Sequence, residues 1–228
     1  MSTGRHIGKV VVDIAGGEEE KKTLLPSPTT SVQAIPKSYF HPAKSYIIAG
    51  GLGGMGLELM YWMAERGARR FVLTSRSGVK TPTHKLMIKM VKQGMGCSVV
   101  VSTEDGGCES GARVVIKQAE SLGPIGGIFL STLVLENESI DKITAAMYRK
   151  VMYAKSTQGL VFDRLLRALP YPVDYFVGFS SIAAGRGFAG QTNYAFANSI
   201  LERVCEQRRA DGLHGLAIQW GMIGDVGE

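Results

Sequence analysis

Cysteine, tryptophan and histidine are scarce in this chain of 228 residues, which holds three, two and four of them respectively. The three cysteines are odd in number, far apart, and in no Cys-x-x-Cys pair; they are Cys97, Cys108 and Cys205. This usage excludes a disulfide scaffold and predicts free thiols in a reducing compartment. The histidines lack the spacing of metal ligands, so we expect no bound metal.

Long hydrophobic runs are lacking too. No apolar stretch approaches the ~20 residues of a transmembrane helix, and no signal peptide opens the sequence. We therefore expect a cytoplasmic protein without membrane contact. The net charge of +6 is mild and no basic–aromatic stripe is present, which disfavours nucleic acid as a partner. An anionic cofactor or an acidic carrier protein suits this charge equally well.

Apolar residues are plentiful and regularly patterned. They make up 45% of the chain against 20% charged residues, enough for one real core. We predict strands at 45–49, 70–75, 97–102, 126–132, 173–179 and 214–219, and helices at 55–66, 84–94, 109–122, 140–169 and 190–210. The alternation predicts an α/β fold of Rossmann type, a doubly wound parallel sheet of six to seven strands with helices on both faces.

The most informative stretch, residues 49–56, reads Ala-Gly-Gly-Leu-Gly-Gly-Met-Gly. A strand, a Gly-x-Gly-x-x-Gly turn and a helix together can hold a dinucleotide. We expect Gly51 to permit the tight turn, Gly53 to let the backbone approach the pyrophosphate, and Gly56 to allow close packing of helix and strand. The helix N-terminus would attract the phosphates. Leu52, Gly54 and Met55 complete the predicted turn; a plain flexible turn is the alternative.

The second strand ends in a base where an NAD site has an acid. In such sites an Asp or Glu about 20 residues beyond the glycines binds the ribose 2′-hydroxyl. Here the position holds Arg76, after Ser75, and a guanidinium can grip a 2′-phosphate. We predict NADPH, with Ser75 and Arg76 in its site. A solvated loop charge is the alternative.

Residues ahead of the sheet divide into two parts. We predict one short strand within 1–14; residues 15–43 are charged and proline-containing, which predicts a linker. The domain proper then runs over 44–228.

Polar side chains follow the strand at 173–179. Chemistry in such sheets is placed at the carboxyl ends of the strands, and Ser181 lies there. Tyr194 and Asn198, four residues apart, share one face of the next helix. These residues also have alternatives to a catalytic role. Ser181 could simply cap a helix, and Lys155, on the helix before this strand, could be a solvated surface charge.

Together these motifs resemble the ketoreductase domain of an animal-type fatty acid synthase, a short-chain dehydrogenase/reductase, over residues 37–227. The resemblance is carried by segments within 44–54, 73–78, 123–129, 174–181, 185–191, 193–199 and 219–227. It implies Tyr194 as general acid, Lys155 as the cation that lowers the pKa of this tyrosine and binds the nicotinamide ribose, and Ser181 as the group that orients the ketone. Asn198 would hold Lys155 or a relay water.

The resemblance also implies an activity. This is NADPH-dependent reduction of a 3-ketoacyl thioester on an acyl carrier protein, in fatty acid synthesis. A polyketide-type ketoreductase and a catalytically silent NADP-binding module are the alternatives. Further cofactor contacts are implied at Ser102, Thr103, Ser131, Gly221 and Met222.

The implied partners are a carrier protein with a phosphopantetheine-linked chain, the structural half of the ketoreductase, and an enoyl reductase domain. Residues 1–14 resemble the end of that last domain. The chain would then be a fragment of a multifunctional synthase.

Three departures from the relatives stand out. Ala49 replaces a threonine, which removes a hydrogen bond. Leu130-Ser131-Thr132 replaces smaller residues beside the nicotinamide ribose, where bulkier side chains are expected to crowd the cofactor. The loop 102–106 lacks the usual adenine-side aspartate. Acyl-chain preference, stereochemistry and oligomeric state stay open.

Overall fold

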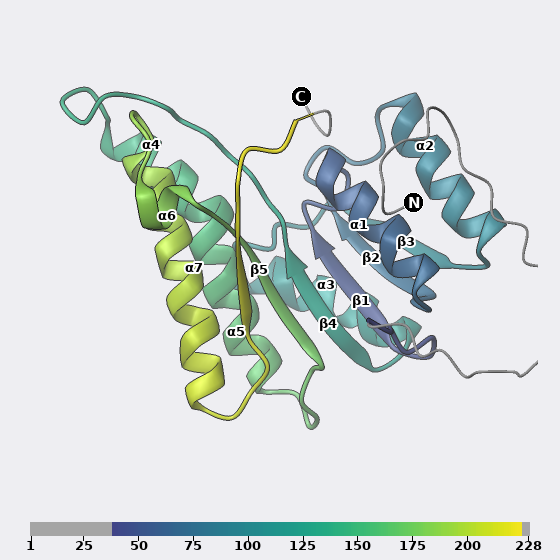
Figure 1. Cartoon of the computed structure of the whole chain (residues 1–228). Coiled ribbons are helices and arrows are strands. Elements are labelled where there is room, and N and C mark those ends of the chain that lie inside the picture. The colour runs from purple at the N-terminus through teal and green to yellow at the C-terminus, as the bar shows by residue number, and fades with distance from the viewer. Residues whose placement is uncertain (1–37, 225–228) are drawn as a thin grey trace, which may run out of the picture. The chain divides into compact units, whose positions relative to one another are not determined.

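A parallel sheet of six strands, in the order β3-β2-β1-β4-β5-β6, organises the part of the chain that the structure describes, residues 38–224 of a computed structural model (Figure 1). The strands are β1 (Ser45–Ala49), β2 (Arg70–Thr74), β3 (Ser98–Ser102), β4 (Ile125–Leu130), β5 (Tyr175–Ser181) and β6 (Leu216–Trp220). The helices are α1 (Gly54–Glu65), α2 (Pro82–Lys89), α3 (Glu109–Leu122), α4 (Ala145–Met152), α5 (Gln158–Arg167), α6 (Ala183–Arg186) and α7 (Thr192–Ala210). Two π-helical turns complete the set, η2 (Met90–Gly94) and η3 (Tyr153–Thr157). The predicted α/β fold of Rossmann type is confirmed.

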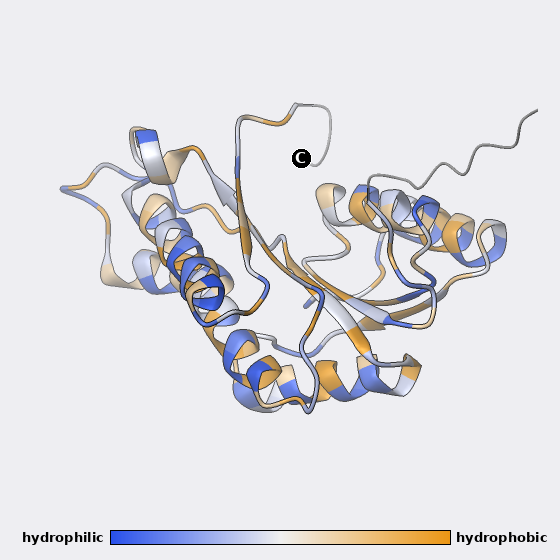
Figure 2. Cartoon of the chain, turned by 60° about the horizontal axis from the view of Figure 1, so that its bottom comes forward, coloured by the Kyte–Doolittle hydropathy of each residue, from blue (hydrophilic) through white to orange (hydrophobic). Residues whose placement is uncertain are grey.

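Helices cover both faces of the sheet. One face packs against α3, α5 and α7, and the other against α1 and η2, so the core forms two layers. Figure 2 shows helices on both sides of the sheet, with hydrophobic and hydrophilic residues on each helix, as amphipathic packing requires. Between residues 38 and 224, no helix is both long and apolar enough to cross a membrane.

The long predicted helix at 140–169 differs from the structure. It begins only at Ala145, because the Thr144 hydroxyl caps the chain there by accepting from the Met147 N–H at 3.2 Å. The turn η3 then interrupts it and separates α4 from α5. The four-residue α6 was not predicted, since one turn is too short to show a helical period.

The predicted linker over 15–43 overlaps the fold at its end. Phe40 is buried at 2% exposure and packs edge-on against Tyr46 and Trp62, with ring centroids 5.3 and 5.5 Å apart. Its backbone N–H donates to the Arg66 carbonyl at 2.9 Å. The predicted strand within 1–14 and the linker up to residue 37 lie outside the described residues.

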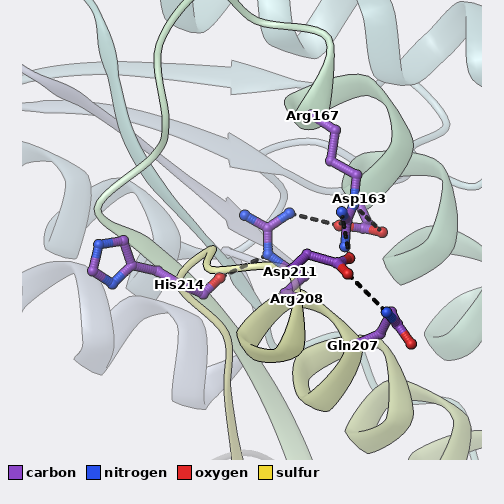
Figure 3. A network of polar contacts seen from close by, with 6 residues as sticks. All are labelled: Asp163, Arg167, Gln207, Arg208, Asp211 and His214. Atoms are coloured by element: carbon purple, nitrogen blue, oxygen red, sulfur yellow. Dashed lines mark hydrogen bonds and ion pairs between the residues drawn. The ribbon is translucent and has the colours of Figure 1, made fainter.

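A buried ion-pair network joins the C-terminal ends of α5 and α7. Arg208, 2% exposed, donates to Asp163 at 2.5 Å and through Nε to the His214 carbonyl at 2.7 Å. Asp163 also accepts from Arg167 at 2.9 Å. The pairs therefore fix the turn that leads from α7 into β6. Figure 3 shows the network of Asp163, Arg167, Gln207, Arg208, Asp211 and His214.

We predict that Asp163→Ala lowers the free energy of unfolding by about 3–5 kcal/mol, because it leaves the buried Arg208 without its carboxylate. Urea denaturation measures this loss. Glu109→Ala is the control: its partners Arg113 and Arg164 are exposed, so its effect should be a small fraction of that at Asp163. Equal losses at the two sites would contradict the assigned role of the network.

Candidate active site

The sequence-predicted site residues gather at the carboxyl edge of the sheet. Ala49 at the end of β1 pairs with Thr74 and Leu130, and Leu130 pairs with Gly178 of β5. Strand β5 continues three residues past this point, to Ser181, which pairs with Trp220 of β6. The longer β5 therefore carries Ser181 beyond the level of the glycine turn.

The glycine turn is built differently from the prediction in one respect. Gly50, not Gly51, has the left-handed backbone, with φ of +75°. Gly51 is confined instead by β2, because a Cβ there would lie 2.8 Å from Leu73 Cβ. At Gly56 a Cβ would lie 2.5 Å from the Gly50 carbonyl oxygen, so this glycine lets α1 close onto the turn. The predicted close packing at Gly56 matches this geometry.

The N-terminus of α1 is open to an anion. Its cap residue is Gly53, and no side chain caps the first turn or places an acid there. The first N–H groups of a helix lack intrahelical partners and carry the positive end of its dipole. The uncapped end and the close approach at Gly56 fit a pyrophosphate held across residues 51–56.

The ends of β2 and β3 form the neighbouring part of the edge. Arg76 is exposed, and Ser75 is half-buried with its N–H donating to the Ser102 carbonyl at 2.9 Å. Ser102 is buried, and Thr103 is exposed beside the turn at Gly78. The structure thus brings the four residues predicted for the adenosine side together at adjacent strand ends.

Lys155 is buried without a carboxylate. Its side chain points from η3 into the sheet edge, where the residue is 5% exposed, and Nζ donates to the Thr132 carbonyl at 3.2 Å. No ion pair reaches it from the described residues. Burial lowers the pKa of Lys155 from 10.5 to about 8, because a low dielectric disfavours the charged form. A solvated lysine is therefore excluded.

Tyr194 and Ser181 lie at the same place as this lysine. Lys155 Nζ is 5.5 Å from the centroid of the Tyr194 ring. Burial raises the pKa of Tyr194, and hydrogen bonding to Asn198 and Ser181 opposes the rise. Burial has the largest effect on this pKa, and the lowering expected from Lys155 stays a prediction.

Asn198 is placed beside Tyr194 and not on the lysine. Its Nδ2 donates to the Tyr194 backbone carbonyl at 2.9 Å, one helical turn back. Its Oδ1 is buried and has no hydrogen-bond partner among the described residues. The expected contact with Lys155 is absent from the described hydrogen bonds. An unpaired buried acceptor at this point fits a site completed by another molecule.

Residues 131 and 132, expected to crowd the cofactor, hold the backbone instead. Ser131 donates to the Ala49 carbonyl from its N–H at 3.1 Å and from Oγ at 2.7 Å. Thr132 Oγ1 donates to the Ala154 carbonyl at 2.6 Å and lies 2.9 Å from Gln158 Oε1. These bonds connect β1 and η3, so the bulk at Thr132 faces protein.

Two supporting residues were missed by sequence reasoning. Asn193 is fully buried; it donates to the Glu136 carbonyl at 2.9 Å and accepts from the Tyr194 N–H at 2.7 Å, which fixes the start of α7. Glu202 accepts from Ser180 and from Gln219, and so ties β5 to β6. The feature that could have identified them in the sequence is a polar residue on a helix face that packs against the protein.

Gly221 and Met222, expected to contact the cofactor, follow β6 and are exposed, Met222 at 93%.

We predict that Lys155→Met raises the free energy of unfolding at pH 7 by roughly 1–3 kcal/mol, because it removes a buried charge. The folded pKa lies below the unfolded value, so wild-type stability increases as pH rises from about 8 toward 10.5. The advantage of the variant should therefore shrink across that range. Chemical denaturation at pH 7.0 and 9.5 measures it; a variant less stable than wild type at pH 7 would contradict the burial argument.

The model of the KR domain family matches residues 44–225. Among curated proteins, highly reducing polyketide synthase 40 of Fusarium pseudograminearum is 33% identical over 230 residues, and highly reducing polyketide synthase ALT1 of Alternaria alternata is 34% identical over 227 residues. Both alignments cover 100% of this chain and 8% of the relative. The chain thus spans a small part of these synthases.

Solved ketoreductases share the fold. A-type ketoreductases from a modular polyketide synthase match with a TM-score of 0.76 and 30% identity, over 87% of this chain and 42% of that one. The first ketoreductase of the tylosin PKS matches with a TM-score of 0.75 and 29% identity, over 86% and 42%. KR domains use NAD(P)H. The chain therefore belongs to the KR-domain family, oxidoreductases of the short-chain dehydrogenase/reductase superfamily of the kind found in polyketide synthases.

Proposed function

We propose that this chain uses NADPH to reduce the 3-keto group of an acyl thioester on a carrier protein, giving the 3-hydroxyacyl thioester. The observation that carries the proposal is the buried ammonium of Lys155 over the ring of Tyr194, with no carboxylate to pair it. Burying an unpaired charge costs stability, and packing does not require it, so such a lysine is typical of a functional site. The Ser181 and Tyr194 side chains lie close enough for Ser181 to oppose the rise of the Tyr194 pKa, so both hydroxyls would donate to one bound ketone oxygen.

The proton chemistry follows from these groups. When bound, NADPH supplies the hydride that adds to the carbonyl carbon. The Tyr194 hydroxyl gives its proton to the carbonyl oxygen, so that the ketone gains one hydride and one proton and becomes an alcohol. The ammonium of Lys155 stabilises the phenolate left behind, and Ser181 orients the oxygen. Asn198, with its unpaired Oδ1, would hold a water that returns a proton to the Tyr194 phenolate.

The preference for NADPH rests on Arg76. Its guanidinium is exposed at the end of β2, where a ribose 2′-phosphate would lie beyond the glycine turn. Gly51–Gly56 would hold the pyrophosphate, and Lys155 the nicotinamide ribose. Ser102 and Thr103 would lie on the adenine side.

The parent assembly is proposed from two sources. The sequence resembles animal-type fatty acid synthases, and such a parent would supply an unbranched fatty-acyl substrate, with the structural half of the ketoreductase and an enoyl reductase as partner domains. The curated relatives are polyketide synthases. Both present a 3-ketoacyl thioester on a carrier, so the reaction is the same. Relative rates with unbranched and α-methyl 3-ketoacyl thioesters distinguish the two parents.

We predict that Tyr194→Phe lowers kcat for ketone reduction at least about 100-fold, because no other donor replaces the phenol. Loss of NADPH absorbance with a 3-ketoacyl thioester or trans-1-decalone measures it. NADPH binding should persist in the variant. Tyr61→Phe, on the half-buried face of α1, is the control and should keep wild-type activity. If Tyr194→Phe stays within a few-fold of wild type, Tyr194 is not the acid. Tight NADPH binding by wild type without turnover on any ketone would favour the silent module.

Replacing Arg76 by Glu should lower the NADPH-to-NADH ratio of kcat/KM by about 10–100-fold, since a charge-assisted contact to the phosphate is exchanged for repulsion. Initial rates with each cofactor measure the ratio. Arg113→Ala removes an exposed arginine of α3 and should leave the ratio unchanged. An unchanged ratio in Arg76→Glu would show that this arginine is a solvated charge.

A further inference from the structure

Lys155 lies in a π-helical turn, η3, and the two sides of this turn face different parts of the protein. In η3, residues Tyr153–Thr157, the chain is wound wider than in the α-helices on either side. Lys155 is buried at 5% exposure, whereas Tyr153, two residues earlier, is 42% exposed. Such turns cost hydrogen-bond geometry and persist where other contacts hold them. The contacts of Tyr153 are therefore of interest.

Tyr153 reaches the loop between β3 and α3. Its hydroxyl donates to Asp105 Oδ2 at 2.8 Å, and Asp105 Oδ1 accepts from the Gly107 N–H at 2.9 Å. The Tyr153 ring lies against Gly107, where an added Cβ would be 2.6 Å from ring carbon Cε1. One carboxylate thus holds the loop and the tyrosine at once.

A second tie supports the same turn from the inside. Thr132 bonds the Ala154 carbonyl and accepts from Lys155, and the Gln158 amide lies between Thr132 and the loop, 2.7 Å from the Cβ position of Gly106. The turn that carries Lys155 is therefore held by the segment that follows β4 on one side and by the β3–α3 loop on the other. Ser102 and Thr103, proposed for the adenosine side of the cofactor, begin that loop.

We propose that Tyr153 and Asp105 are positioning residues, whose hydrogen bond keeps η3 in the form that buries Lys155 and couples cofactor binding at the β3–α3 loop to the placement of this lysine. The coupling rests on the proposed NADPH site; the hold on η3 does not. In this proposal, Tyr153 and Asp105 act through Lys155 and not on the ketone itself.

The protonation states of Tyr153 and Asp105 keep their hydrogen bond in place at neutral pH. The hydrogen bond to Asp105 raises the pKa of Tyr153 to about 12, so its hydroxyl stays a donor. Asp105 faces no cation among the described ion pairs, and its partners are this hydroxyl and the backbone N–H of Gly107. The carboxylate is therefore committed to the loop and the tyrosine.

The test compares Tyr153→Phe with Tyr171→Phe. The first removes only the hydroxyl bond to Asp105; the second removes a comparable bond, to the Ile125 N–H at 3.2 Å, away from η3. Hydrogen exchange by mass spectrometry should show amides of 153–157 exchanging roughly fivefold faster or more in Tyr153→Phe, and unchanged in Tyr171→Phe. The NADPH dissociation constant, from cofactor fluorescence, should rise about 3–10-fold in Tyr153→Phe alone.

An Asp105→Ala background completes the cycle. There, Tyr153→Phe should have no further effect on exchange or on NADPH affinity, because its partner is already gone. Full retention of either effect, or unchanged exchange in the single variant, overturns the proposal. The exchange measurement needs no cofactor. A wild-type chain that binds no NADPH would overturn the proposed function and the coupling, while exchange would still decide whether the pair holds η3.

Discussion

A buried ammonium that forms no ion pair within residues 38–224 is the constraint on which the site depends. Lys155 is almost fully enclosed, and a neutral carbonyl, that of Thr132, is its hydrogen-bond partner. Burying such a charge lowers the free energy of unfolding, so favourable packing elsewhere in the fold must offset this cost. The turn η3 directs the lysine inward. Tyr194 then meets a cation held in a low dielectric, where its effect on a developing negative charge is large.

The topology of the sheet is enough to position the other predicted site residues. Because parallel strands end at one edge, the glycine turn after β1, Arg76 after β2 and Ser181 at the end of β5 lie along the same edge of the sheet. The three-residue extension of β5 past β4 carries Ser181 beyond the level of the glycine turn. Two polar residues outside the chemistry, the buried Asn193 and the half-buried Glu202, hold the start of α7 and the ends of β5 and β6 in place.

Sequence reasoning reached the strands, the glycine turn and the set Lys155, Ser181, Tyr194 and Asn198, because each rests on periodicity or on a motif. It missed η3, since one extra residue in a turn leaves a 3.6-residue period almost unchanged over a short window. It assigned the tight turn to Gly51, whereas the left-handed residue of the turn is Gly50, and it expected Leu130-Ser131-Thr132 to crowd the cofactor. Those outcomes depend on distances between segments far apart in the chain. The direction of the Tyr194 pKa likewise required the burial of its ring.

The most direct test of this account is the titration of Lys155 itself. Lysines labelled with ¹³C at Cε give one NMR signal each, and Lys155→Arg assigns the signal that disappears. The account predicts a midpoint near the pKa of about 8 that burial imposes, well below the ordinary 10.5. A midpoint close to 10.5 would show that the ammonium is solvated or paired, and the proposed proton-transfer centre would lose its basis.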